Sequence, residues 1–376
     1  YTLWHTLSLH DALPIWGGEA YAGYWESCTG DTPADCPFFD LGSEVSQVAT
    51  AGSHSCALTD EGRVVCWGWD GGGQYECSNI LGYGDSYDCG ACETPADWGP
   101  LPIVGEAQQI SAYSVHNAAV LADGNVQTWG CARNPTITPA GDWPENDYVD
   151  FGGNAVQVTS GSHYHCVLTQ GGDVYCWGVN DLGQLGYGHT DFVSADQIPN
   201  DAGPVDLGGT AVQISSGGNH TCAVLESGEV LCWGWAGANG KLGYGNTEDV
   251  GDDEQPAEIG PIDLGGTAVQ VAAGGSATGG HTCVLLDNGS VKCWGGIVYG
   301  AGEIVGDDDV PADVDPVEMG GSVQRLTSGG DFTCALMDTG LVRCFGPNTD
   351  GELGYGHTDY IGDDEAPGDV CEVPVM

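Results

Sequence analysis

The chain has 376 residues and carries 54 Asp and Glu against 6 Lys and Arg, a formal net charge of −48. Such a surface repels phosphate backbones and anionic lipid, which argues against nucleic-acid and membrane-surface binding, and it attracts cations such as Ca²⁺. No apolar run is long enough for a transmembrane helix, and 17 cysteines indicate an oxidising compartment: periplasm, cell surface or outside the cell.

The first 15 residues differ from everything that follows them. They lack the basic start and the clean apolar run of a signal peptide, and Pro14 stands where a strand would be expected. The stretch TLSLHDALPI (residues 6–15) resembles translated sequencing-adapter sequence. We therefore expect residues 1–15 to be a non-native leader and residues 16–376 to form a single domain.

From residue 16 onward, one pattern recurs. An aromatic-Gly pair returns at intervals of 48 to 62 residues, with its aromatic residue at Trp16, Trp67, Trp129, Trp177, Trp233, Trp294 and Phe345. In each repeat a β-branched segment such as residues 206–221 leads into a hairpin, and most hairpins are followed by an LGYG segment. A period of this length, with strand and turn signals and no helical signal, predicts a propeller with one blade per repeat.

The hairpin reads CALTDEGRVVCWG at residues 56–68, and four later copies keep both cysteines. A sixth copy has Ala118 and Thr128 in their place. A glycine always stands six residues after the first of these positions, at Gly62, Gly124, Gly172, Gly228, Gly289 and Gly340. We assign a structural role to these glycines and to Trp67, Trp129, Trp177, Trp233 and Trp294.

The position of this glycine predicts a three-residue turn whose last residue is left-handed, closed by a hydrogen-bonded Thr59–Arg63 pair. Counting outward, the two cysteines then face each other at a non-hydrogen-bonded pair, where side chains approach most closely. The predicted disulfides are Cys56–Cys66, Cys166–Cys176, Cys222–Cys232, Cys283–Cys293 and Cys334–Cys344. Reduced core cysteines and a zinc site remain alternatives, although the ten-residue spacing fits zinc poorly.

Seven further cysteines lie outside the hairpins, so at least one of them has no partner within the chain. They are Cys28, Cys36, Cys77, Cys89, Cys92, Cys131 and Cys371. The CxxC at Cys89 and Cys92 is a weak signal for redox chemistry or zinc, and loop disulfides explain it better. The pairing of these seven residues stays open.

Histidines offer the best candidates for catalysis, but most of them follow the repeat. His54, His116, His220 and His281 all stand two residues before the first cysteine position. A catalytic residue would occur once, so the recurrence favours a structural role at the entry of a strand. His189 and His357 lie in paired GYGHTD loops and are expected to share a local hydrogen-bonding role, whereas His163 and His165 alternate along a strand and could bind a metal weakly. No catalytic motif is present, and we expect no enzyme activity.

Acidic loops between the repeats are the sharpest functional candidate. They read GDDEQP, GDDDVP and GDDEAP, and each could offer three carboxylates to Ca²⁺ without matching the EF-hand spacing. The candidate calcium ligands are Asp252, Asp253, Glu254, Asp307, Asp308, Asp309, Asp363, Asp364 and Glu365. The alternative is a solvated acidic turn, and no motif requires any other cofactor.

The repeat pattern HTCxLxxxGxVxCWG, followed by GxLGYG, resembles the regulator of chromosome condensation repeat family, and most closely its cysteine-rich, secreted bacterial type. The matching residues include His220-Thr221, His281-Thr282, the turn glycines, the Trp-Gly pairs and the LGYG segments. The resemblance covers residues 16–376 and implies an all-β, seven-bladed β-propeller, which we expect the N- and C-terminal strands to close into a ring. Members of this family include a nuclear exchange factor and a bacterial inhibitor of β-lactamases, but the charge and cysteines of this chain argue against a chromatin role.

These observations favour a secreted, periplasmic or cell-surface binding module without catalytic activity. Its propeller-face loops would recognise a protein or a glycan, with neither nucleic-acid binding nor membrane insertion. A structural protein that self-assembles outside the cell is the alternative, and an enzyme of unknown type is a remote one.

Overall fold

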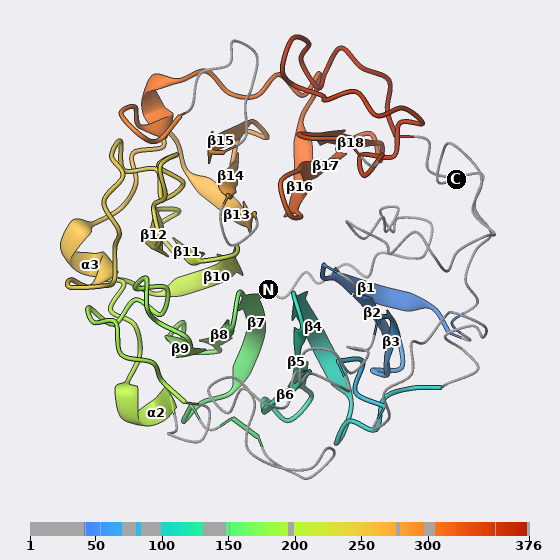
Figure 1. Ribbon diagram of the computed structural model, residues 1–376, viewed down its shortest axis with the longest axis vertical. Helices are drawn as coiled ribbons and strands as arrows, with labels where there is room; N and C mark the ends of the chain where they lie inside the picture. Colours follow the sequence, from blue (N-terminus) through green and yellow to red (C-terminus); the bar gives the residue numbers. More distant parts are fainter. Residues whose placement is uncertain are drawn as a thin grey trace.

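The computed structural model describes residues 41, 43–52, 54–69, 80–83, 99–130, 148–149, 151–194, 199–275, 279–296, 305–349 and 351–373. Within these ranges the chain forms six three-stranded antiparallel sheets, each built from three consecutive strands. The sheets stand like blades around a common axis, with the first strand of each innermost (Figure 1). None of the helices in these ranges has the length and apolarity needed to span a membrane.

The strands of the six blades follow in chain order. The bounds are β1 (Val45–Thr50), β2 (His54–Thr59), β3 (Val64–Gly68); β4 (Ala107–Tyr113), β5 (His116–Leu121), β6 (Val126–Gly130); β7 (Ala155–Gly161), β8 (Tyr164–Thr169), β9 (Val174–Gly178); β10 (Ala211–Ser216), β11 (His220–Leu225), β12 (Val230–Gly234); β13 (Ala268–Gly274), β14 (His281–Leu286), β15 (Val291–Gly295); and β16 (Val323–Ser328), β17 (Thr333–Met337), β18 (Val342–Phe345). Short helices α2 (Pro199–Ala202), α3 (Pro256–Ile259) and η4 (Pro311–Asp313) lie between blades.

The predicted all-β propeller architecture is confirmed for these six blades. Trp16 and the other residues that would build a seventh blade lie outside the described residues, as does the expected leader at residues 1–15. The count of seven and the closure of the ring therefore stay predictions.

Each hairpin turn has the geometry that the glycine predicts. In the first blade the Thr59 amide donates a hydrogen bond to the Arg63 carbonyl at 2.8 Å, and Gly62 has a φ of 73°. The same left-handed conformation recurs at the glycine of every described hairpin, with φ between 73° and 86°. The register that follows places Cys56 directly opposite Cys66.

In place of a full fourth strand, the outer edge of each blade pairs with short backbone segments. The Val205 amide donates to Val174 at the start of β9, and the Ile262 amide donates to Val230 at the start of β12. The C-terminal segment follows the same rule, because the Val373 amide donates to the Val342 carbonyl at 3.0 Å. Up to Val373, the C-terminal segment thus belongs to the sixth blade.

A glutamine on each of the first five inner strands joins its blade to the next one. Nε2 of Gln213 donates to the Val271 carbonyl at 2.9 Å, and its Oε1 accepts from the Val271 amide at 2.7 Å. Equivalent pairs join Gln47 to Ile110, Gln109 to Val158, Gln157 to Ile214 and Gln270 to Leu326. At each of these five interfaces, the two hydrogen bonds of the glutamine help to fix the position of one inner strand against the next.

The LGYG segments connect the outer parts of the blades. The indole of Trp233 donates to the Gln184 carbonyl at 3.1 Å, and a Cβ on Gly186 would come within 2.8 Å of that indole. The hydroxyl of Tyr187 accepts a hydrogen bond from the Cys176 amide and donates one to the Cys176 carbonyl, both at 3.0 Å. This hydroxyl thereby satisfies backbone groups on the outer edge of β9 that would otherwise be open for pairing.

Candidate functional site

Disulfides close five of the six described hairpins. The structure joins Cys56–Cys66, Cys166–Cys176, Cys222–Cys232, Cys283–Cys293 and Cys334–Cys344, which are the pairs expected from the hairpin geometry. Their Cα atoms are 4.0 to 4.1 Å apart, and all ten residues are buried. In the hairpin without cysteines, Ala118 and Thr128 face each other in the same register.

The remaining cysteines contribute little to a site. Cys371 is exposed and has no disulfide partner among the described residues. The other six, at positions 28, 36, 77, 89, 92 and 131, lie outside the described residues.

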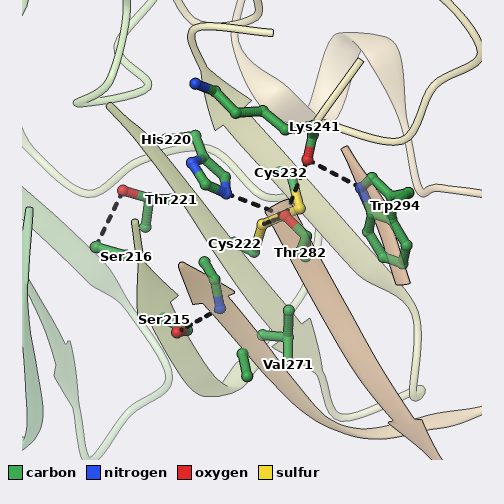
Figure 2. The surroundings of a disulfide bond; sticks show 12 residues. Ser215, Ser216, His220, Thr221, Cys222, Cys232, Lys241, Val271, Thr282 and Trp294 are labelled. Atoms are coloured by element: carbon green, nitrogen blue, oxygen red, sulfur yellow. Dashed lines mark hydrogen bonds between the residues drawn. A yellow bond between two sulfur atoms is a disulfide. The ribbon is translucent and has the colours of Figure 1, made fainter. Parts of the chain in front are cut away.

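The repeated histidines join blades, as their structural interpretation predicts. Nε2 of His220 lies 3.0 Å from the hydroxyl of Thr282 on the next blade, beside the Cys222–Cys232 disulfide (Figure 2). His281 makes the same contact with Thr333 at 2.7 Å, and His54 makes it with Asn117. Burial lowers the pKa of His281 to about 3, so this imidazole is neutral at pH 7.

The paired loop histidines have the expected local role. Nδ1 of His189 accepts a hydrogen bond from the Asp191 amide, and the ring of His189 stacks on Tyr187. His357 repeats both contacts with Asp359 and Tyr355. These histidines shape their loops.

A pocket of about 630 Å³ opens beside the fourth blade, between the end of β12 and α3. Two aromatic residues and five carboxylates line it: Trp235, Tyr244, Glu248, Asp249, Asp252, Asp253 and Glu254. We call it the acidic pocket. Its lining includes one of the predicted calcium loops, Asp252 to Glu254, and the segment that begins at Trp235, directly after the Trp233-Gly234 pair.

The carboxylates of the acidic pocket crowd one another. Oxygens of Asp252, Asp253 and Glu254 all lie within 4.8 Å of one another. Burial raises the pKa of Glu254 to about 7, and a hydrogen bond that the protonated carboxyl donates to Asp253, together with the charges of Asp253 and Asp252, adds to this shift. Burial also raises the pKa of Asp249. Because the negative charges disfavour one another, the pocket favours a cation.

The other two predicted calcium loops differ from each other. Asp363, Asp364 and Glu365 converge within 4.8 Å as the first triad does. The main cause that raises the pKa of Glu365 to about 7 is a hydrogen bond that its protonated carboxyl donates to Asp364. Among the described residues, Asp307, Asp308 and Asp309 form no such cluster. The sequence pattern is the same, but only two of the three loops bring three carboxylates together.

A buried lysine, which the sequence analysis did not single out, lies next to the acidic pocket. Lys241 is 1% exposed; its Nζ donates to the Gly279 carbonyl at 2.9 Å and stands 4.0 Å from the ring centroid of Trp235. Burial lowers its pKa to about 8, against the opposing charge of Asp249. The sequence does contain a signal for this residue: Lys241 stands in GKLGYG at the position that Gln184 and Glu352 occupy in two other repeats.

Comparisons with known proteins agree with the repeat pattern. One model of the regulator of chromosome condensation (RCC1) repeat matches residues 45–74, 155–184, 211–240 and 323–352. A second model of that repeat matches residues 171–224.

Among curated proteins, the ultraviolet-B receptor UVR8 of Arabidopsis thaliana is 26% identical over 364 residues, covering 93% of this chain and 76% of the receptor. The human E3 ubiquitin-protein ligase HERC2 is 26% identical over 280 residues; the match covers 72% of this chain but only 5% of the ligase. Yeast RCC1 (Prp20), solved with Kap60 bound, has a TM-score of 0.61 at 18% identity, with 96% of this chain and 82% of that chain covered. At this identity the structural likeness establishes the fold alone.

Proposed function

Because the chain belongs to the regulator of chromosome condensation repeat family, we propose that it is a non-catalytic binding module, located outside the cytoplasm, that recognises a basic segment of another protein. The observation that carries this proposal is the acidic pocket, in which five carboxylates and two aromatic rings surround about 630 Å³. A site of this composition accepts Lys or Arg side chains, because the carboxylates bind the charged head and the rings pack against its aliphatic stem.

The charge of the whole chain supports a basic partner. A net charge of −48 attracts a cationic surface over long distances and raises its rate of association. A neutral glycan would leave the crowded carboxylates without compensation, so a protein is the better candidate. Yeast RCC1 is an example of this fold in a complex with a protein, Kap60.

The disulfides support a location outside the cytoplasm. Five buried disulfides, one in almost every described hairpin, form and persist in an oxidising compartment. In a reducing cytosol the same cysteines would be kept as thiols.

The test is a binding measurement on the full chain with a lysine-rich peptide, an acidic peptide and a neutral oligosaccharide. The triple variant Asp252→Asn, Asp253→Asn, Glu254→Gln should weaken binding of the lysine-rich peptide by about tenfold, because it removes three carboxyl groups and their negative charge from the acidic pocket. The matched control is Asp363→Asn, Asp364→Asn, Glu365→Gln, which makes the same change in net charge at the other carboxylate cluster.

Three outcomes would contradict the proposal: equal loss of affinity in both variants, preference for the oligosaccharide, or no binding at all. Equal loss would mean that only net charge matters. Light scattering on the same samples distinguishes a monomeric binding module from a protein that self-assembles.

The convergent carboxylates support a second proposal, that Ca²⁺ binds at Asp252, Asp253 and Glu254 and at Asp363, Asp364 and Glu365. Carboxylate oxygens are the ligands that Ca²⁺ prefers, and an ion that binds only the folded state stabilises it. The melting temperature should rise when millimolar Ca²⁺ replaces EDTA at constant ionic strength, and each triple variant should reduce the rise. An unchanged melting temperature would rule out both sites.

A further inference from the structure

The interface between the second and third blades differs from its neighbours in one polar contact. At the other described interfaces, the first residue of the middle strand meets a hydroxyl or an amide of the following blade. The pairs are His54 with Asn117, Tyr164 with Thr221, His220 with Thr282 and His281 with Thr333. At the interface between β5 and β8, two imidazoles meet instead.

The two imidazoles are those of His116 and His163. Nε2 of His116 lies 3.0 Å from Nδ1 of His163, and the ring planes meet at 69°. His116 begins β5 and is fully buried, whereas His163 is exposed. His163 belongs to the turn before β8, so the expectation that it alternates with His165 along a strand is wrong. Its φ of 67° is rare outside glycine.

The distance between the two nitrogens is close to that between two ligands of one metal ion. Imidazole nitrogens that bind a tetrahedral ion at about 2.0–2.1 Å are about 3.3 Å apart. A small separation of the rings from 3.0 Å would therefore admit an ion between them. The exposed side of His163 gives the ion a path from solvent.

The charge state of the pair suits metal binding, because an imidazole must be neutral to be a ligand. Burial lowers the pKa of His116 to about 2, with a further contribution from the charges of His165, His163 and His54. Burial also lowers the pKa of His163, against the charge of Asp181. Protons therefore compete weakly at pH 7, and the carboxylate of Asp181 adds negative charge near the exposed ring.

This interface holds one more unpartnered buried nitrogen than the other described interfaces do. Nδ1 of His116 has no hydrogen-bond partner in the described part of the chain, as is also true of Nδ1 of His54, His220 and His281, but here Nε2 of His165 lacks one too. Nδ1 of His165 is held by the Ser160 hydroxyl at 2.9 Å, and its ring centroid lies 6.3 Å from that of His116. The three histidines do not converge within 4.8 Å, so His165 stands beside the pair.

We propose that His116 Nε2 and His163 Nδ1 bind one divalent transition-metal ion, Zn²⁺, Cu²⁺ or Ni²⁺, whose remaining coordination positions are filled by water. Imidazole suits these ions, whereas Ca²⁺ and Mg²⁺ prefer the oxygens of the acidic loops. The site is separate from the acidic pocket, and its existence does not depend on the proposed partner.

The experiment titrates Ni²⁺ or Cu²⁺ into the full chain after treatment with EDTA, in a Cys371→Ser background that removes the exposed thiol. Calorimetry should show one ion per chain, and the electron paramagnetic resonance spectrum of Cu²⁺ should show two nitrogen ligands. His163→Ala should weaken binding at least tenfold, and this variant keeps the fold because its side chain is exposed.

The matched control is His189→Ala, which removes an exposed histidine of the GYGHTD loop, outside the pair, and should leave the affinity unchanged. The Asp252→Asn, Asp253→Asn, Glu254→Gln variant should also bind as the parent does. The proposal is overturned if the parent binds no ion after EDTA treatment, or if His163→Ala binds as tightly as the parent.

Discussion

In the first blade, the glycine that ends the hairpin turn meets two separate requirements. Gly62 has a φ of 73°, which a residue with a side chain adopts at a cost of about 1 kcal/mol. A Cβ at this position would also lie 2.8 Å from Cβ of Glu106 and 3.1 Å from the Ala107 carbonyl of the next blade. The six turn glycines were predictable from local turn chemistry. The close approach of Glu106 and Ala107 was not, because it arises between blades.

We predict that Gly62→Ala lowers the free energy of unfolding by about 2–4 kcal/mol, since backbone strain and a clash with Glu106 add together. The control is Gly340→Ala in the equivalent turn of the sixth blade, where φ is 81° and no atom of the described residues lies within 4 Å of the added Cβ. That variant should lose only about 1 kcal/mol. Urea denaturation of both variants measures the difference, and equal losses would show that the contact with the next blade is unimportant.

Buried histidines make stability depend on pH at the same residue scale. Burial lowers the pKa of His54 from 6.5 to about 4, although its hydrogen bond with Asn117 opposes the shift. The unfolded chain therefore binds a proton at His54 below pH 6.5, while the folded chain binds it only near pH 4. The resulting stabilisation is fully present above pH 6.5 and is lost as the pH falls to about 4.

Between pH 7 and pH 4 the free energy of unfolding of the parent chain falls partly because of His54. We predict that His54→Asn makes this fall about 3 kcal/mol smaller than in the parent chain. The comparison must be relative, because Glu254 and Glu365, with pKa values raised to about 7, stabilise the folded state as the pH falls. Urea denaturation at several pH values gives both curves. Parallel curves would mean that the burial of His54 does not control its protonation.

At the scale of the element, one hairpin supplies its own control for the disulfides. The β5–β6 hairpin pairs Ala118 with Thr128 where the other five pair cysteines, yet its register is the same. Strand pairing thus does not need the cross-link. The prediction of the hairpins succeeded because the turn and its two strands are encoded within thirteen consecutive residues, such as 56–68.

We predict that the double variant Cys222→Ala, Cys232→Thr, which copies the natural pair of the β5–β6 hairpin, folds and loses about 3 kcal/mol of stability. Non-reducing peptide mapping should recover four hairpin disulfides from this variant and five from the parent. Free thiols at Cys222 and Cys232 in parent protein made under oxidising conditions would contradict the assignment.

At the scale of the whole molecule, the features that the sequence did not reveal are those that form between blades. The inner-strand glutamines can be seen to recur in the sequence, but the two hydrogen bonds that each makes to the next blade depend on the spacing of the blades around the axis (Figure 1). His116 and His163 are likewise brought together from different blades, and Lys241 reaches Gly279 from a loop 38 residues earlier. Sequence periodicity predicted each unit, whereas these contacts belong to their arrangement.

The distribution of charge leads to the last prediction. With 54 acidic and 6 basic residues, the folded chain repels itself, and compaction increases this repulsion. Salt weakens the repulsion, because the Debye length falls from about 30 Å at 10 mM to about 8 Å at 150 mM ionic strength. We therefore expect the melting temperature to rise by about 5 °C over this range.

The rise should be the same in NaCl and KCl, because screening depends on ionic strength and not on the identity of a monovalent ion. A larger rise in CaCl₂ at equal ionic strength would indicate binding at the carboxylate clusters in addition to screening. A chain held together by surface ion pairs would instead lose stability as salt is added, and that result would refute the prediction. Here the described arginine and lysine side chains are few, and Arg63, paired with Glu61, is exposed, so ion pairs offset little of the repulsion.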